Sequence, residues 1–176
     1  MSFYKTKVSK DKMELIMKFK VDETKCDNPE HYESYLMYNA LNDINQGFST
    51  TYLYIEENEQ TEEKNIMGYI TLRMSSFIKD MGESRKYGYP ALEIAELAVD
   101  KNYTGRGIGT DMVMDTITIA NELNEIISVK YIVLCADPRV QGFYEKLEFQ
   151  KMYDRIEDIP REHFNLSAIP MYIKLR

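Results

Sequence analysis

Three glycines within five residues stand directly between an apolar run and a helical pattern. They are Gly105, Gly107 and Gly109 of "YTGRGIGTDM", and the apolar run before them is "LEIAELAV". A glycine-rich loop at a helix start exposes several backbone N–H groups, and the helix dipole adds partial positive charge there. Phosphate oxygens bind well to such a loop. We therefore expect the glycines to make room for a phosphate-bearing ligand, and a turn without a ligand is the alternative.

Two common phosphate-binding motifs do not match this loop. A Walker A motif needs a glycine followed by lysine and then by serine or threonine, and the chain contains no Gly-Lys pair. A dinucleotide-binding fingerprint would begin at Gly105 and Gly107, but Thr110 then occupies the place of its third glycine. Neither motif explains the glycines.

A helix is predicted between Asn28 and Gly47. Asn28 is a favourable N-cap, Pro29 suits the first turn, and Gly47 can end the helix. The apolar residues at helical spacing are Tyr32, Leu36, Met37, Ala40, Leu41 and Ile44. Residues 49–57 and 65–76 are rich in β-branched and aromatic side chains, so they predict a β-hairpin, with an acidic tip between them.

The glycine loop lies inside a predicted strand–helix–strand unit. Residues 78–90 hold two glycines, a proline and mixed charges, and predict a loop. Residues 91–100 and 129–136 are two near-continuous apolar runs, which predict buried strands. The helix between them has its apolar stripe at Val113, Ile117, Ala120, Leu123 and Ile127. If the two strands are neighbours, this order makes them parallel.

The C-terminal part predicts one more helix and two strands. Asp137 and Pro138 suit the start of a helix over residues 138–147. Residues 149–156 and 168–176 predict a closing pair of strands. The whole pattern indicates an α/β domain with a mixed sheet.

The glycine loop and a later aromatic segment resemble those of one enzyme family. "ELAVDKNYTGRGIGTDMV" supplies a strand end, a loop of the form [Q/R]-x-x-G-x-[G/A] and a helix start, and "GFYEKLEF" is similar to an FYxxxGF segment. In this order they resemble the GNAT superfamily of N-acetyltransferases, over roughly residues 29–176. The chain departs from the pattern at Thr104, where Gln or Arg is usual, and at Glu148, where the family has glycine.

The resemblance implies a fold, a co-substrate and a set of site residues. The fold would be a single α/β domain, 1–176, with a mixed, mostly antiparallel central sheet, flanking helices and a splayed CoA-binding strand. Acetyl-CoA would be the co-substrate, with its pantetheine arm along the strand, the thioester carbonyl on the Leu97 N–H and the pyrophosphate on the loop amides. The cofactor-binding residues would be Leu97, Ala98, Val99, Thr104, Gly105, Arg106, Gly107, Ile108, Gly109, Thr110, Asp137 and Tyr144.

Tyr144 matches the tyrosine of the family's segment. It would give a proton or a hydrogen bond to the leaving thiolate, since a phenol is protonated at neutral pH, and packing in the core is its alternative role. The acceptor amine must also lose a proton, and the strand carries two carboxylates, Glu93 and Glu96, on opposite faces. We expect Glu93 to be the base, with a salt bridge as its alternative role. His31 and His163 are further candidate bases. No metal is expected.

Composition limits the partners. With 44% apolar and 29% charged residues the chain has the balance of a globular protein, and its longest uncharged apolar stretch, "YIVLCA", is too short to cross a membrane. The N-terminal segment lacks the apolar run of a signal peptide, so we expect a cytoplasmic protein. A net charge of -7 disfavours nucleic acid as a partner.

We therefore expect an acetyl-CoA-dependent N-acetyltransferase that acts on a primary amine of a small molecule or a protein. Two alternatives stay open. "YLMYNALNDINQGFSTTYLYIEE" and "IMGYITL" are similar to a branch of toxins that acetylate aminoacyl-tRNA. A non-catalytic CoA-binding or partner-binding module of the same fold is the other. A homodimer is a further open possibility.

Overall fold

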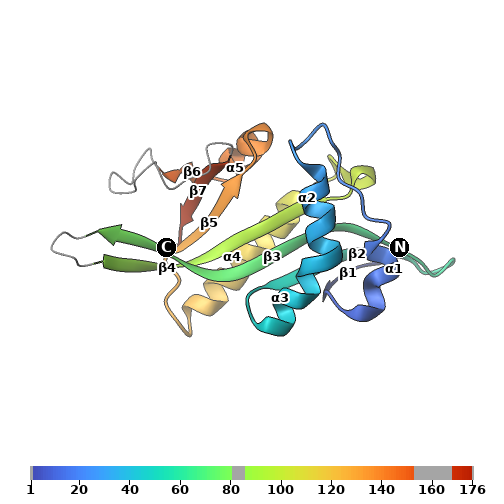
Figure 1. The fold of residues 1–176 in the computed structure, drawn as a ribbon, viewed down its shortest axis with the longest axis horizontal. Coiled ribbons are helices and arrows are strands. Elements are labelled where there is room, and N and C mark those ends of the chain that lie inside the picture. The colour runs from blue at the N-terminus through green and yellow to red at the C-terminus, as the bar shows by residue number, and fades with distance from the viewer. Residues whose placement is uncertain (1, 81–85, 153–167, 176) are drawn as a thin grey trace. The chain divides into compact units, whose positions relative to one another are not determined.

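The computed structural model describes residues 2–80, 86–152 and 168–175. The strands are β1 (Ser2–Lys7), β2 (Thr50–Asn58), β3 (Glu63–Asp80), β4 (Lys86–Val99), β5 (Tyr131–Ala136), β6 (Gln150–Lys151) and β7 (Ile169–Lys174) (Figure 1). The α-helices are α1 (Met13–Ile16), α2 (Pro29–Ser34), α3 (Ala40–Gln46), α4 (Ile108–Asn124) and α5 (Gln141–Lys146). Short 3-10 turns occur at Lys10–Lys12, Lys101–Tyr103 and Pro138–Val140, and a π-helical turn, Tyr35–Asn39, joins α2 to α3.

The strands hydrogen bond in the order β1-β2-β3-β4-β5-β7-β6. The pairs β1–β2, β2–β3, β5–β7 and β6–β7 are antiparallel. β4 and β5 are parallel, with Ala91 opposite Tyr131 and Ile94 opposite Leu134. The predicted α/β class, the mostly antiparallel sheet and the parallel strands on either side of α4 are thus confirmed.

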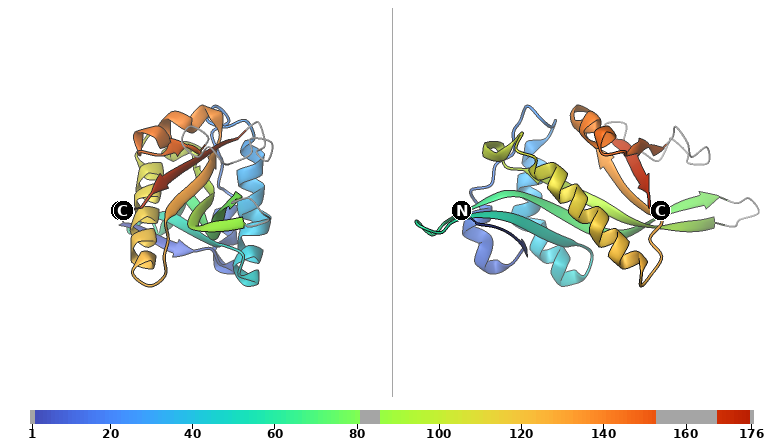
Figure 2. Two further views of the ribbon diagram at one scale, coloured as in Figure 1. Left: turned by 90° about the vertical axis from the view of Figure 1, so that its left-hand side faces the viewer. Right: turned by 180° about the vertical axis from the view of Figure 1, so that it is seen from behind.

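The described chain forms two compact units, which share β3, β4 and α4. The first unit is Met1–Arg73 with Ala95–Val113. In it, α2 and α3 run along one face of β1 to β3 (Figure 2). A hydrophobic core of this unit combines apolar residues of the helices with apolar residues of the strands. The buried members of that core are Val8, Ile16, Phe19, Leu36, Ala40, Leu53, Ile55, Ile66, Tyr69 and Ala98.

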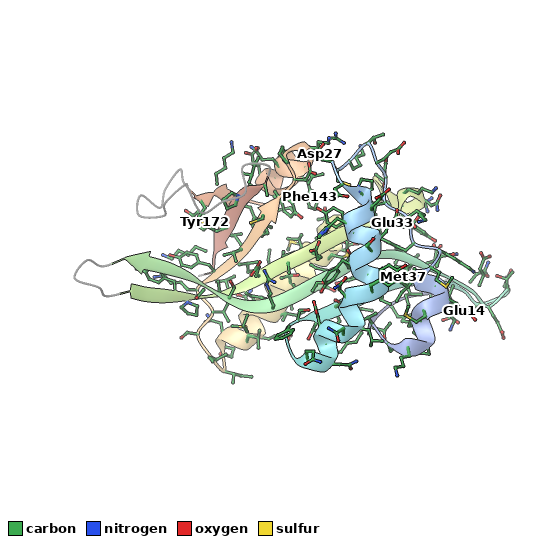
Figure 3. The ribbon with its side chains drawn as sticks, in the orientation of Figure 1. Glu14, Asp27, Glu33, Met37, Phe143 and Tyr172 are labelled. Carbon is green, nitrogen blue, oxygen red and sulfur yellow. The ribbon has the colours of Figure 1, made fainter. Side chains whose placement is uncertain are left out.

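The second unit is Met74–Ile94 with Met114–Arg176. Its core includes Ala91, Val133, Met152 and Tyr172, and Tyr172 lies on β7 (Figure 3). The ring of Tyr131 packs edge-on against that of Tyr172, with 5.8 Å between the ring centroids. These contacts join β4, β5 and β7 across the parallel pair.

The predicted helix between Asn28 and Gly47 is confirmed, and its local signals act as expected. The side chain of Asn28 accepts a hydrogen bond from the His31 N–H at 3.2 Å. Gly47 ends the helix with a φ of 73°, the left-handed conformation that favours glycine. The predicted hairpin is also confirmed, as β2 and β3.

Other expectations were wrong. Within the predicted loop 78–90, the described residues at both ends belong to β3 and β4, because backbone pairing between these strands outweighs their polar composition. Ile127 does not continue the apolar stripe of α4: the helix ends at Asn124 and Ile127 is exposed. The N-terminal strand β1 was not predicted. Residues 153–156 of the penultimate predicted strand lie outside the described residues. Among the described residues, no helix is long and apolar enough to span a membrane.

Candidate functional site

The end of β4 is fixed by Asp100, a buried residue that the sequence did not single out. Its N–H donates to the Met67 carbonyl at 2.9 Å. Its carboxylate accepts hydrogen bonds from the Asn102 N–H and from the Lys20 N–H, each at 2.9 Å. The Lys101 N–H donates to the Lys20 carbonyl at 2.7 Å. The glycine loop therefore starts from a strand end that β3 and the segment around Lys20 hold in place.

Two glycines of the loop adopt left-handed backbone. Gly105 and Gly107 have φ values of 79° and 87°, a left-handed conformation that residues with a side chain rarely adopt. A Cβ built on either residue meets no atom within 4 Å, and both glycines are exposed. The Gly107 carbonyl then accepts the Asp111 N–H at 3.0 Å in the first turn of α4. Here the glycines are required by backbone conformation, and the space over the loop is open.

Arg106 is held over an aromatic ring beside this loop. Its guanidinium carbon lies 4.9 Å from the centroid of the Tyr103 ring. The Tyr103 hydroxyl donates to Oε2 of Glu56 at 2.6 Å. Burial, and then the Glu56 carboxylate, raise the pKa of Tyr103 to about 12. A positive charge thus lies two residues after Thr104, the position where the family usually has Gln or Arg.

Gly68 brings β3 close to the strand that precedes the loop, and sequence reasoning missed it. A Cβ on Gly68 would lie 2.9 Å from the Ala98 carbonyl oxygen, 3.0 Å from Cε of Met112 and 3.4 Å from Cγ2 of Ile108. This face of β3 therefore lies against the first turns of α4. A glycine inside a strand pattern is a signal for close backbone approach, and it could have been used here.

The next residue of β3, Tyr69, lies on the opposite face of the sheet. Tyr69 is fully buried, and its hydroxyl donates to the Tyr32 carbonyl of α2 at 2.9 Å. Within the first unit, α4 thus starts on one face of the sheet and α2 covers the other.

On β4, Leu97, Ala98 and Val99 lie between Glu96 and Asp100 in the first unit. Pairing of β4 with β5 covers Ala91–Ile94 and stops there, although β4 continues to Val99. Leu97 and Val99 are half-buried, and Ala98 is buried. The part of β4 expected to carry the pantetheine arm is therefore beyond the paired segment, as the resemblance implied.

Glu96 and His31, considered separately in the sequence, form a pair. His31 Nε2 lies 3.0 Å from Glu96 Oε1, and the two residues are 65 positions apart. The Glu96 side chain is 15% exposed and that of His31 is 51% exposed. Burial, and then the nearby Glu96 carboxylate, raise the pKa of the Tyr69 phenol well above its usual value. The pair lies on the face of the sheet that α2 covers.

The remaining predicted residues belong to the second unit. Glu93 is half-buried on β4 opposite Val133. The carboxylate of Asp137 accepts the Arg139 N–H at 2.9 Å and starts the turn before α5. Tyr144 is buried on α5, and its ring packs edge-on between Phe143 and Phe149 at centroid distances of 4.9 and 5.8 Å. Figure 3 shows Phe143 on this helix.

The backbone after Tyr144 forms a Schellman turn around Glu148. The Tyr144 carbonyl accepts the Phe149 N–H at 3.1 Å, and the Glu145 carbonyl accepts the Glu148 N–H at 3.1 Å. Glu148 has a φ of 68°. The family's glycine at this position is thus explained by the turn, which this chain forms with a glutamate at a cost in strain.

Two further expectations concern bases and metals. His163 lies outside the described residues. Among the residues that the structure describes, no group of three or more His, Cys, Asp or Glu side chains could hold a metal ion.

The loop has a backbone and surroundings that suit a phosphate group. Two glycines in the left-handed conformation lead into a helix N-terminus, the space above them is open, and Arg106 stands beside them.

The model of the acetyltransferase (GNAT) family matches residues 17–149 of the chain. This chain belongs to the GNAT acetyltransferase family. It is an acyltransferase, and acetyl-CoA is its co-substrate. No curated protein has a significant sequence match to it.

Solved structures of toxins share the fold over nearly the whole chain. A mutant of the KacT toxin is 14% identical with a TM-score of 0.75, and the match covers 99% of this chain and 95% of that one. A mutant of the AtaT toxin is 14% identical with a TM-score of 0.73, over 98% and 89%. AtaT complexed with acetyl-methionyl-tRNAfMet is 16% identical with a TM-score of 0.72, over 96% and 94%. At these identities the likeness establishes the fold.

Proposed function

We propose that this acetyltransferase transfers the acetyl group of acetyl-CoA to a primary amine of a small molecule or a protein. The observation that carries the proposal is the loop from Thr104 to Thr110, where Gly105 and Gly107 adopt left-handed backbone at the start of α4. Such a loop offers its amides to a pyrophosphate. A module that had lost its ligand would have no need for a glycine-rich loop with open amides at this helix start.

The chemistry is divided among a few residues. The N–H of Leu97 would stabilise the negative charge that develops on the thioester oxygen. Tyr144 would give a proton to the leaving thiolate. Glu93 and His31 stay candidate bases for the acceptor amine, and Asp137 a predicted cofactor contact. The strand Leu97–Val99 and the loop amides would bind the rest of the co-substrate.

A second acceptor class, the α-amine of an aminoacyl-tRNA, is favoured by a specific observation. AtaT, which shares the fold, has been solved in complex with acetyl-methionyl-tRNAfMet. In this chain, Lys20 and Lys101 are exposed and are joined by a backbone hydrogen bond next to the glycine loop. The net charge of -7 opposes this class, because phosphate contacts need positive charge. The small or protein amine therefore remains the first candidate.

One assay distinguishes the two classes. Free thiol release from acetyl-CoA is measured with amines, peptides and charged tRNA, at low and at moderate salt. Each phosphate contact makes binding weaken by about one power of the salt concentration. We expect turnover with an amine or a peptide and a mild response to salt. Acetylation of charged tRNA with a steep loss in salt would support the second class instead.

Tyr144→Phe tests the enzyme against the non-catalytic module. The substitution removes one hydroxyl and keeps the ring that packs on Phe149. If Tyr144 serves the leaving thiolate, kcat falls while the Michaelis constant for acetyl-CoA changes little. Full activity in this variant would contradict the assigned role, and no thiol release by the wild type with any acceptor would contradict the enzyme.

A further inference from the structure

His31 and Glu96 meet on the face of the sheet opposite to the start of α4. Gly68 faces Ile108 and Met112 of α4, whereas the following residue, Tyr69, bonds to α2. Glu96 belongs to the α2 face, because its carboxylate contacts His31 of that helix. Alternation places the next side chain, Leu97, on the other face.

In this arrangement acetyl-CoA and the acceptor would approach β4 from different faces of the sheet. The glycine loop leads into α4, so a ligand on the loop amides approaches from the α4 side. An acceptor that approaches from the α2 side reaches the same stretch of β4 without displacing that ligand. His31 is half-exposed on this side and Glu96 is largely covered.

We propose that His31, oriented by Glu96, takes the proton from the acceptor amine. With Glu96 ionised, Nε2 of His31 carries the hydrogen and donates it to Oε1 over 3.0 Å. Nδ1 then holds the lone pair and is the proton acceptor. Glu96 is a positioning residue, since it fixes the tautomer and stabilises the imidazolium that forms. Because acetyl transfer to an amine is itself the proposed function, this role rests on it.

The proton balance closes with these groups. An ammonium gives one proton to the imidazole, and the freed lone pair on nitrogen forms the C–N bond to the acetyl carbon. The C–S bond of the thioester breaks, the thiolate takes a proton from Tyr144, and the second proton that the nitrogen loses restores the Tyr144 phenol. The products are the amide, the free thiol and one proton, which the imidazole releases to water.

Other titratable groups among the described residues lie near the pair. On β3, the phenol of Tyr69 has its pKa raised by burial first and so stays protonated in the working range. On α2, the ring of Tyr32 packs edge-on against His31 at 5.3 Å. Glu33 (Figure 3) accepts the Val21 N–H and pairs with Lys20. Glu30 is exposed in the same turn as His31 and offers a matched control.

The test compares His31→Gln, Glu96→Gln and the control Glu30→Gln. General-base catalysis contributes about 10² to 10⁴-fold, so we expect His31→Gln to lower kcat/KM for the acceptor by about 100-fold where the amine is protonated. The loss should shrink as the pH rises and the amine becomes neutral without help. Glu96→Gln should show a smaller loss with the same trend, and Glu30→Gln none. Acetyl-CoA affinity should stay unchanged in all three.

A merely structural contact would give another result. A loss by the same factor at every pH, or no loss, would overturn the role of His31 while thiol release by the wild type would leave the proposed function standing. The tautomer supplies a readout that needs no activity. The chain has two histidines, so the His31→Gln spectrum assigns the ¹⁵N resonances of His31. A neutral ring with its hydrogen on Nε2 supports the proposal, and a hydrogen on Nδ1 overturns it.

Discussion

A Cβ on Gly68 would lie 2.9 Å from the carbonyl oxygen of Ala98. Cβ atoms do not approach backbone oxygens this closely. The backbone at Ala98 belongs to β4 and cannot move aside cheaply, because Asp100, two residues on, donates its N–H to the Met67 carbonyl of β3. The absence of a side chain at Gly68 therefore sets how close β3 comes to the strand that leads into the glycine loop.

Gly68→Ala should lower the free energy of unfolding by about 1–3 kcal/mol, the usual range for overpacking. It should also weaken acetyl-CoA binding, because the displaced strand end carries the loop. Chemical denaturation and calorimetry measure the two effects. Gly142→Ala is the matched control, since a Cβ there meets nothing within 4 Å; it lies in α5 and should stabilise by roughly 0.5–1 kcal/mol. Wild-type stability in Gly68→Ala would contradict the close approach.

The raised pKa of Tyr103 predicts that the protein loses stability at alkaline pH. This pKa of about 12 in the folded protein exceeds the value of about 10 for a free phenol. Because the pKa of Tyr103 is higher in the folded than in the unfolded state, its protonated phenol stabilises the fold. This contribution is fully present below about pH 10 and is lost as the pH rises through about 12. Tyr103→Phe cannot titrate, so its stability should fall less over this range than that of the wild type. Denaturation at several pH values measures the difference.

Tyr38→Phe serves as the control for that comparison, because Tyr38 is 77% exposed. Its alkaline profile should match the wild type. If Tyr103→Phe also follows the wild-type profile, the titration of Tyr103 does not cause the alkaline loss of stability.

Glu148→Gly should stabilise the protein. Glu148 adopts a φ of 68° at the end of α5, and relief of this strain is worth about 1 kcal/mol. Glu62, with a φ of 57° at the hairpin tip, should respond in the same way. Glu122→Gly, in the last turn of α4, should instead destabilise by up to roughly 0.5–1 kcal/mol. Thermal denaturation of the three variants measures these changes. A lower melting temperature for Glu148→Gly than for the wild type would contradict backbone strain at this turn.

Local signals predicted much of this molecule. Asn28 and Gly47 bounded their helix because an N-cap and a left-handed terminator act within a few residues. Gly105 and Gly107 indicated the loop before α4 for the same reason. The expectations from resemblance, the mixed sheet and the acetyl-CoA co-substrate, were confirmed, whereas the roles of the site residues stay predictions.

Long-range contacts escaped prediction. His31 and Glu96 are 65 residues apart and Tyr103 and Glu56 are 47 apart, so no local pattern pairs them. Asp100 resembles any acidic residue after a strand until its bond to the Lys20 N–H is seen. The error over residues 78–90 has the opposite cause, because strand pairing overrode a composition typical of loops.

The most direct measurement is calorimetric titration of acetyl-CoA into the wild type, Gly107→Glu and Gly47→Glu. Both glycines are exposed, have positive φ and open space around a Cβ, so both variants carry the same new charge and a similar strain of about 1 kcal/mol. If the loop binds the pyrophosphate, Gly107→Glu should weaken binding at least about 100-fold, or about 2.7 kcal/mol, while Gly47→Glu binds like the wild type. Unchanged affinity in Gly107→Glu, or an equal loss in both variants, would contradict a co-substrate held by this loop.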